Sequence, residues 1–460
     1  MTARCDRAPA HPGDADAHPT NPHTGDVMKR PIKTAALALG AAAALAAAPA
    51  WAFDAAPKIN DGDTAWMLTS TLLVLLMIVP GLALFYGGLT RAKNMLSTMT
   101  QIGAVACLAM LVWVMWGYTM AFGDGGNAFV GGFGKLFLAG ITPDSVSGTI
   151  PEYVFACFQM TFAAITVALV LGSTVERMKF SAVLVFAIVW LTIVYFPIAH
   201  MVWAPDGLFF KAGALDFAGG TVVHINAGVS ALVAALILGK RIGYGSEHIV
   251  PHSLTLTGVG TGLLWVGWFG FNAGSALAAN GSAGLAMINT FVATAAAGLA
   301  WMLAERVNGH KGSALGFCSG IVAGLVAVTP AAGNSGPFGA IVLGAVASVV
   351  CFYAVSVLKP RLGYDDALDA FGVHGIGGMI GAIGTAIVYA PALGGPGKPD
   401  YETGHQLLVQ LGAVATTIVL ATIGTLIAVY LAKAVTGLRV TTDVEREGLD
   451  LGEHGERAYN

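Results

Sequence analysis

The stretch Asp216-Phe217-Ala218-Gly219-Gly220-Thr221-Val222-Val223-His224-Ile225-Asn226-Ala227-Gly228 decides the fold, because it places a histidine inside a segment of apolar and small residues. A second stretch, running from Asp366 through Phe371-Gly372-Val373-His374-Gly375, repeats the pattern with the same eight-residue step from acid to histidine. An ionisable side chain inside a membrane-spanning segment is costly, and it therefore marks a candidate functional site. The two histidines are accordingly the first candidates for function.

The composition is that of a membrane protein. Of the 460 residues, 56% are hydrophobic and 11% are charged, whereas soluble domains carry about 25% charged residues. The net charge of −3 offers no general attraction for nucleic acid. The five cysteines are scattered, so we expect no disulfide framework. Motifs for nucleotides or metals (Walker A, HExxH, CxxC) do not occur, and we expect no cofactor, no metal and no enzymatic activity.

Long apolar segments recur along the chain, and each is long enough to cross a bilayer. They predict an all-α polytopic membrane protein with eleven transmembrane helices, near residues 64–89, 97–122, 152–175, 180–203, 219–239, 253–277, 284–304, 313–331, 336–358, 369–391 and 404–434. An odd number of spans places the two ends of this region on opposite sides of the membrane.

The basic residues give the orientation. Alternate connections carry Arg or Lys pairs, whereas the others hold only isolated lysines; the basic set comprises Arg91 and Lys93, Arg177 and Lys179, Lys240 and Arg241, Arg306 and Lys311, Lys359 and Arg361, and Lys433 and Arg439. Under the positive-inside rule the basic connections are cytoplasmic. We therefore expect the spans to begin outside and the C-terminus to lie in the cytoplasm.

The matching Asp-to-His steps also predict an internal repeat. Asp216 and Asp366 enter the fifth and tenth spans, and in a continuous helix eight residues would make about two turns. Because five spans separate the two histidines, spans 1–5 and 6–10 have opposite orientations and form an inverted five-plus-five repeat. Such repeats place their substrate site near the membrane midplane.

The two ends of the chain lie outside this repeat. Residues 1–27 are polar and are interpreted as a disordered leader or a mis-assigned start. Residues 28–52 combine a basic start, an apolar run and the small-residue site Ala50-Trp51-Ala52, which is typical of a signal peptide. We expect a mature transmembrane domain over residues 53–436, with its N-terminus in the periplasm, and a cytoplasmic regulatory tail over residues 437–460.

The candidate site residues each allow two interpretations. The histidines are in apolar surroundings and are expected to be neutral, and a neutral pair can share one hydrogen bond. Each could instead be a packing residue. The aromatic residues near the outer span ends are either an interfacial belt or a cation–π cage. Asp216 is either a helix cap or, in addition, a charge that attracts a cation.

Several segments resemble the ammonium transporters of the Amt/Mep/Rh family, and most closely the bacterial branch. The resemblance rests on residues 83–94, Pro197-Ile198-Ala199-His200-Met201-Val202-Trp203, the stretch from Asp216 to Asn226, Gly267 to Ser275, and Phe371 to Gly375. It extends to the tail, through Arg446-Glu447-Gly448-Leu449-Asp450. It covers essentially all of the mature chain.

This resemblance implies a homotrimer in the bacterial inner membrane, with one ammonium pore in each subunit. It implies an outer ammonium site of Phe162, Trp203 and Ser275, and a stacked gate of Phe162 and Phe271. It further implies a conducting pair, His224 and His374, supported by Asp216, which passes ammonia and relays the proton separately. The tail would dock a PII-type signal protein at the cytoplasmic face.

Three rival functions differ in what they require. A channel for a neutral solute such as urea explains a pore but not a cage of Trp, Phe and Ser above Asp216. A membrane metalloenzyme needs a third protein ligand beside the two histidines, and none is evident. An ammonium sensor needs an output domain, and none follows Asn460.

Overall fold

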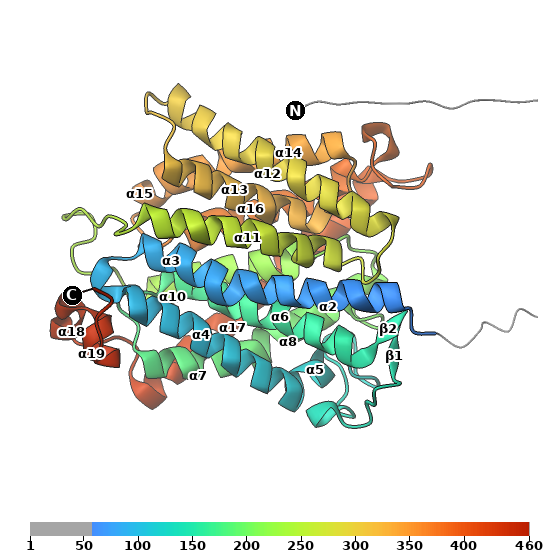
Figure 1. Ribbon diagram of the computed structural model, residues 1–460, viewed down its shortest axis with the longest axis horizontal. Coiled ribbons are helices and arrows are strands. Elements are labelled where there is room, and N and C mark those ends of the chain that lie inside the picture. Colours follow the sequence, from blue (N-terminus) through green and yellow to red (C-terminus); the bar gives the residue numbers. More distant parts are fainter. Residues whose placement is uncertain (1–57, 460) are drawn as a thin grey trace, which may run out of the picture. The chain divides into compact units, whose positions relative to one another are not determined.

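The computed structural model describes residues 58–459, which are mostly helical (Figure 1). The only sheet in this region is an antiparallel pair of two-residue strands, β1 (Val146–Ser147) and β2 (Ile150–Pro151). The expected leader (residues 1–27) and signal peptide (residues 28–52) lie outside the described residues. The all-α fold class is confirmed.

The first five spans contain several breaks in α-helical geometry, labelled η where the turn is 3₁₀ or π. The first span consists of α2 (Asp61–Leu76), η1 (Met77–Leu82) and α3 (Ala83–Leu89), and the second of η2 (Ala92–Asn94), α4 (Met95–Val112), η3 (Trp113–Gly117) and α5 (Tyr118–Phe122). The third consists of α6 (Glu152–Val170) and η5 (Leu171–Ser173), and the fourth of α7 (Phe180–Trp190), η6 (Leu191–Tyr195) and α8 (Phe196–Trp203). The fifth consists of η7 (Gly220–Ile225) and α10 (Asn226–Leu238). The connections contain η4 (Leu136–Leu138) and α9 (Leu208–Lys211).

The remaining six spans complete the bundle. They are α11 (Leu254–Gly274); α12 (Gly281–Val307); α13 (Ala314–Val328) with η8 (Thr329–Ala331); α14 (Pro337–Tyr353), η9 (Ala354–Leu358) and α15 (Lys359–Leu362); η10 (Phe371–Gly375) with α16 (Ile376–Val388); and α17 (Thr403–Thr436). The turn η11 (Pro391–Leu393) precedes α17, and the tail forms α18 (Thr442–Glu447) and α19 (Leu449–His454). Residues 58–459 therefore contain eleven helical spans, as predicted, with ends that differ by a few residues.

The inverted repeat is visible in local backbone geometry. The fourth and ninth spans each contain a π-helical segment, η6 and η9, and the fifth and tenth spans each begin with one, η7 and η10. Both histidines lie in these opening π-helical turns. The expected two helical turns between Asp and His are wrong in both halves, because the chain is non-helical for the three or more residues that follow each aspartate. There the carboxylate instead accepts hydrogen bonds from the helix start.

The fifth and tenth spans cross antiparallel at a contact between two glycines. A Cβ atom on Gly228 would lie 2.1 Å from the backbone nitrogen of Gly375, so only glycine allows this approach. At the end of the fifth span, Arg241 pairs with Asp365 at the start of the tenth. The crossing brings the two π-helical turns, and hence the two histidines, together in the middle of the bundle.

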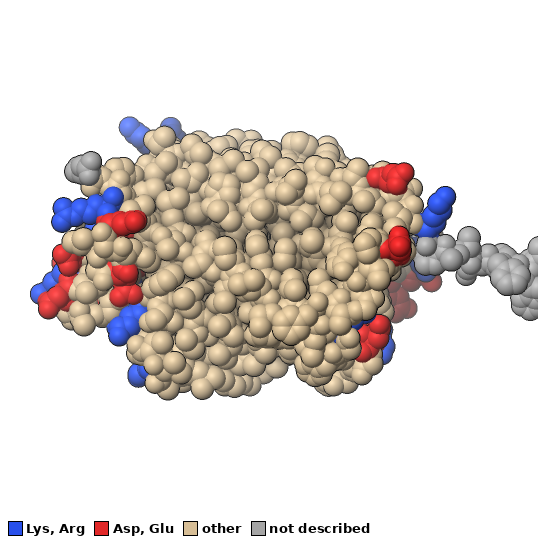
Figure 2. Space-filling view, turned by 60° about the horizontal axis from the view of Figure 1, so that its bottom comes forward, with Lys and Arg blue, Asp and Glu red and all other residues tan. Residues whose placement is uncertain are grey.

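The outer surface matches a lipid environment. Space-filling atoms show a broad uncharged band with charged residues gathered at the two ends (Figure 2). Large apolar side chains such as Leu72, Leu303 and Val435 are more than half exposed in this region. The third, fifth and eighth spans, in contrast, are mostly buried by their neighbours. The chain is a multi-pass membrane protein whose central helices line its interior.

Candidate functional site: a row of three cavities

An open cavity of about 410 Å³ lies at the end of the bundle that carries β1 and β2. Its wall includes all three residues of the predicted cage, Phe162, Trp203 and Ser275. The rings of Phe162 and Trp203 meet edge to face, with centres 5.6 Å apart. The Ser275 hydroxyl donates to the carbonyl of Phe271 at 2.8 Å, which leaves its oxygen lone pairs available as acceptors.

Two stacked phenylalanines close the inner end of this cavity. The rings of Phe162, from α6, and Phe271, from α11, lie 4.1 Å apart and are nearly parallel at 16°. Both side chains are fully buried. Phe162 faces the outer cavity, whereas Phe271 lines the next space inward. The predicted gate pair therefore forms one continuous partition.

The space behind this partition is a narrow lumen of about 10 Å³, which is roughly the smallest space that holds one water molecule. Its lining contains no Asp, Glu, Lys or Arg; it consists of Met77, Leu82, Phe85, Ile165, Leu169, His224, Leu264, Trp268, Phe271, Val322 and His374. A bare ion in such a space loses its hydration without gaining a counter-charge, at a cost of many kcal/mol. A small neutral molecule avoids that cost.

The two histidines face each other in this lumen. Their Nδ1 atoms are 3.3 Å apart and their rings are nearly parallel at 23°. Of a neutral pair, one ring donates and the other accepts at this contact. His224 Nε2 is buried and has no hydrogen-bond partner among the described residues, so a polar group of the pair is left for a molecule in the lumen.

A second layer of side chains holds His224 in place. The imidazole stacks on the indole of Trp268, with ring centres 5.4 Å apart. The Trp268 indole N–H donates to the hydroxyl of Thr329 at 2.9 Å, and that hydroxyl donates to the carbonyl of Leu325 at 2.7 Å. The orientation of His224 is thus fixed through the eighth span.

Asp216 does not line any of these cavities. Its carboxylate accepts hydrogen bonds from the backbone N–H groups of Gly219, Gly220, Thr221 and Val222 and from the Thr221 hydroxyl. Gly219 has a φ of 110°, which a residue with a side chain rarely adopts. The Asp216 carbonyl accepts from the Trp203 indole at 2.9 Å. Asp216 therefore caps the fifth span and orients the cage tryptophan.

An inner cavity of about 560 Å³ completes the row at the basic end of the bundle. It shares His374 and Phe85 with the lumen, and it extends past Tyr86 to Arg241 and Lys359. The outer cavity, the lumen and the inner cavity therefore meet in series. Phe162 with Phe271 stands at the outer boundary of the lumen, His224 lies within the lumen, and His374 lies at its inner boundary.

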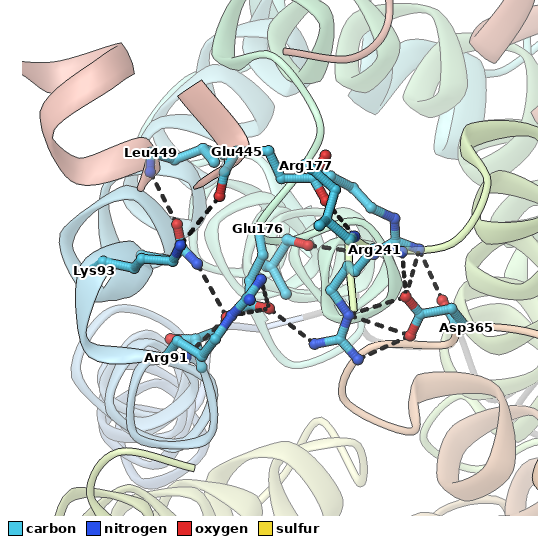
Figure 3. A network of polar contacts seen from close by, with 12 residues as sticks. Arg91, Lys93, Glu176, Arg177, Arg241, Asp365, Glu445 and Leu449 are labelled. Carbon is cyan, nitrogen blue, oxygen red and sulfur yellow. Dashed lines mark hydrogen bonds and ion pairs between the residues drawn. The ribbon is translucent and has the colours of Figure 1, made fainter. Parts of the chain in front are cut away.

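A buried ionic cluster ties the connections at the basic end together (Figure 3). Arg241 contacts Glu176 at 2.9 Å and Asp365 at 2.8 Å, and Arg91 contacts Glu176 at 3.0 Å. Burial alone would raise the pKa of Glu176, but the guanidinium groups of Arg241 and Arg91 outweigh it and lower that pKa to about 2. The cluster joins the loops that lead into and out of the spans lining the lumen.

The tail docks beside this cluster. Lys93 donates to the backbone carbonyls of Glu445 and Arg446, and Asn94 accepts from the N–H of Leu449 at 2.9 Å. The Asp450 carboxylate accepts from the N–H groups of Leu96 and Ser97, at the start of α4. Residues 437–459 therefore pack against the bundle instead of standing free.

Some residues of these sites were not expected from the sequence. The acidic members of the buried cluster, Glu176 and Asp365, lie in connections between spans, and the sequence gives no sign that they are buried and paired with Arg241. Glu152 and Lys135, which form an ion pair in the wall of the outer cavity, come from a helix and the connection before it and share no motif. Among residues 58–459, no group of three His, Cys, Asp or Glu side chains is arranged to hold a metal.

Comparison with known proteins identifies relatives over nearly this whole region. Residues 65–459 match the model of the Ammonium Transporter Family. An ammonium transporter of Aquifex aeolicus is 48% identical over 411 residues, covering 89% of this chain and 96% of its own. The crystal structure of Saccharomyces cerevisiae Mep2 superposes with a TM-score of 0.76 at 35% identity, covering 84% and 89% of the chains. A structure described as a sensor Amt protein gives a TM-score of 0.79 at 29% identity, covering 86% and 98%.

Proposed function

Because the chain belongs to the ammonium transporter family, we propose that the three cavities in series are the path by which it moves ammonium across the membrane. The observation that carries this proposal is the uncharged lumen between two wider cavities, closed at one end by stacked phenylalanines and crossed by a pair of histidines. A path of this kind favours a substrate that is charged outside and neutral inside.

The outer site selects the cation. Phe162 and Trp203 offer aromatic rings, and Ser275 offers a hydroxyl oxygen, in the wall of the outer cavity. An ammonium ion is attracted to aromatic faces by cation–π interaction, worth about 0.5–2 kcal/mol, and it donates hydrogen bonds to an oxygen. Asp216 acts through its hydrogen bond to Trp203 and through its negative charge.

The phenylalanine partition separates the ion from the lumen. As it passes Phe162 and Phe271, ammonium transfers one proton to the neutral imidazole of His224, whose ring centre lies 6.1 Å from that of Phe271, because the uncharged lumen disfavours a free ion. His224 and His374 then hold ammonia by hydrogen bonds, and the proton passes separately between the rings. Neutral imidazoles suit this role, since each has one donor and one acceptor nitrogen.

The protein is proposed to lie in the bacterial inner membrane with its basic end in the cytoplasm. The orientation follows from the positive-inside rule, because Arg91, Arg177 and Arg241 lie close together (Figure 3) and Arg439 contacts the end of the same fifth span. Residues 53–436 form the transport domain, with a periplasmic N-terminus after cleavage of residues 28–52. Residues 437–460 form a cytoplasmic regulatory tail.

Assembly and regulation are proposed on the family's pattern. Three copies form a homotrimer, each with its own pore. A PII-type signal protein docks at the cytoplasmic face, where the tail helices α18 and α19 lie beside the inner cavity's end of the bundle. Binding of that protein to detergent-solubilised transporter, measured with and without residues 437–460, tests this part.

The alternative to an ammonium transporter is a channel for neutral solutes such as urea. It shares the uncharged lumen but gives no role to the Trp203–Phe162 cage. Proteoliposomes with an outward urea gradient and, separately, an inward ammonium gradient distinguish the two. We expect an ammonium-driven current and ammonium uptake into the vesicles, without urea flux. Urea flux without an ammonium response would contradict the proposal.

A further inference from the structure

Besides the uncharged cage, the wall of the outer cavity contains a cluster of charged side chains. Lys135, in the connection between α5 and α6, places its Nζ 2.6 Å from Oε1 of Glu152 and 3.7 Å from a carboxylate oxygen of Asp124. The Tyr118 hydroxyl donates to the same Glu152 oxygen at 2.7 Å. Lys135 Nζ also lies 6.0 Å from the centre of the Tyr118 ring. A primary ammonium is thus held by a carboxylate beside an aromatic face, which is the chemistry that binds ammonium ions.

This group faces the open outer cavity. Tyr118, Asp124, Lys135 and Glu152 all line the outer cavity, together with the cage residues. The side chain of Lys135 is 26% exposed and that of Glu152 is 12% exposed. The backbone N–H of Lys135 donates to the Thr119 hydroxyl at 3.0 Å, which fixes the base of the side chain. The ammonium itself is at the end of four flexible methylene groups and can leave Glu152 without any backbone movement.

One face of α6 connects this group with the cage. Glu152, Phe155, Gln159 and Phe162 follow one another at steps of three and four residues, and all four line the outer cavity. On a helix this spacing places them along one stripe, about 15 Å long. The stripe therefore begins at a carboxylate and ends at the predicted gate.

Gln159 provides an independent sign that this stripe receives a hydrogen-bond donor. The residue is 8% exposed, and its side-chain Oε1 has no hydrogen-bond partner among residues 58–459. A buried acceptor without a partner costs about 1–3 kcal/mol unless a ligand or water satisfies it. Between a carboxylate and an aromatic cage, the donor that fits it is an ammonium N–H.

We propose that Glu152 and Tyr118 form an entry site for small monovalent cations of the ammonium type, and that the Lys135 ammonium is its resident occupant. Incoming ammonium displaces Lys135 from Glu152 and then passes Gln159 to the cage. While Lys135 is in place, it neutralises Glu152, so that inorganic cations do not collect in front of the cage. This inference rests on the proposed transport of ammonium and adds a selectivity step to it.

The test uses full-length protein in proteoliposomes. Ammonium uptake is measured at fixed external ammonium while potassium replaces the bulky N-methylglucamine cation at constant ionic strength. Wild type is expected to be insensitive to potassium. In Lys135→Gln, potassium occupies the vacated carboxylate and reduces uptake about two- to fivefold, the range for a partly exposed charge pair. The double variant Lys135→Gln/Glu152→Gln is expected to be insensitive again, because the carboxylate is gone.

Lys211→Gln is the matched control, because Lys211 is an exposed lysine in α9, in the connection that follows the fourth span, and it does not line the outer cavity. It removes the same charge without vacating a carboxylate and should behave as wild type. If Lys135→Gln fails to insert into the membrane, Lys135→Met is used in its place, and potassium is expected to reduce its ammonium uptake in the same way. Equal potassium sensitivity of ammonium uptake in wild type, Lys135→Gln and Lys211→Gln would overturn the inference. Absence of ammonium uptake in wild type would instead overturn the proposed function.

Discussion

The Trp203 indole N–H donates to the backbone carbonyl of Asp216 at 2.9 Å, so the residue that caps the fifth span also orients the cage. The Asp216 carboxylate is turned away from the cavities and is saturated by hydrogen bonds from the start of η7. Its effect on the outer site is therefore exerted mainly through position. Its charge acts only at a distance.

Substitution of this aspartate should affect both stability and transport. Asp216→Ala leaves several buried N–H groups of η7 without an acceptor, each at a cost of about 1–3 kcal/mol. We expect a thermal unfolding midpoint several degrees lower and loss of ammonium uptake. Asp400→Ala, at an exposed position, is the control and should match wild type. Full uptake by a destabilised Asp216→Ala variant would separate the cap from the transport function.

Replacement of a lumen histidine should remove the proton path. His224→Ala deletes the ring that faces Nδ1 of His374 across 3.3 Å. We expect the ammonium-driven current, recorded on solid-supported membranes, to disappear. His405→Ala changes an exposed histidine at the start of α17 and should leave the current unchanged. A wild-type current in His224→Ala would rule out the relay of protons through this pair.

Thinning of the phenylalanine partition should weaken selectivity. Phe271→Leu removes the ring that stacks on Phe162 at 4.1 Å while keeping an apolar side chain. We expect a potassium leak that wild type lacks, measured as potassium-driven dye release or current in proteoliposomes. Phe291→Leu is a matched control, because Phe291 also packs against a phenylalanine, Phe269, at 4.2 Å but is 46% exposed on the bundle surface. Equal leak in both variants would contradict the assignment of the gate.

The buried ionic cluster should make stability depend on acidic pH. Arg241 and Arg91 hold the folded-state pKa of Glu176 near 2, below its ordinary value of 4.5. Their contribution is therefore complete above about pH 4.5 and is lost as pH falls toward 2; for this fully buried carboxylate it is on the order of 3 kcal/mol. Thermal unfolding in detergent across this range should show a steeper decline for wild type than for Glu176→Gln.

Glu176→Gln should also be less stable than wild type at neutral pH. It leaves buried guanidinium groups partly unpaired, at a cost of about 3–5 kcal/mol. Glu247→Gln changes an exposed glutamate at the same end of the bundle and should keep the wild-type pH dependence. Identical pH profiles for wild type and Glu176→Gln would show that the cluster does not contribute in this way.

Release of the tail should be measurable without any partner protein. Asp450→Ala removes the acceptor of the Leu96 and Ser97 N–H groups, and α19 should then detach more often. We expect faster cleavage within residues 437–459 by limited proteolysis. Asp443→Ala is the control, since Asp443 is exposed and accepts no hydrogen bond in the described region. Equal cleavage rates would show that Asp450 does not hold the tail.

The spans and the repeat were predictable because lipid imposes simple rules on sequence. Apolar length identifies a span, and the matching steps to His224 and His374 indicate the repeat. The non-helical start of the fifth span was not foreseen. It depends on a carboxylate accepting hydrogen bonds from residues three to six positions onward, and on the positive φ of Gly219. Neither feature has a periodic signal.

The site was only partly predictable for a related reason. Resemblance to a family pointed to Phe162 and Phe271, and the apolar setting of two matched histidines pointed to His224 and His374. The fold brings all four to one path. The pairing of Lys135 with Glu152, and of Glu176 with Arg241, depends on three-dimensional proximity across separate connections. Without the fold, a charged residue near a span end is indistinguishable from an ordinary solvated one.

Electrical recording from proteoliposomes under an inward ammonium gradient, with wild type compared to Asp216→Ala, tests the ammonium path most directly. We predict a current and a matching ammonium uptake for wild type, and neither for Asp216→Ala. Wild-type protein that inserts correctly but gives no current and no uptake would contradict transport of ammonium through these three cavities.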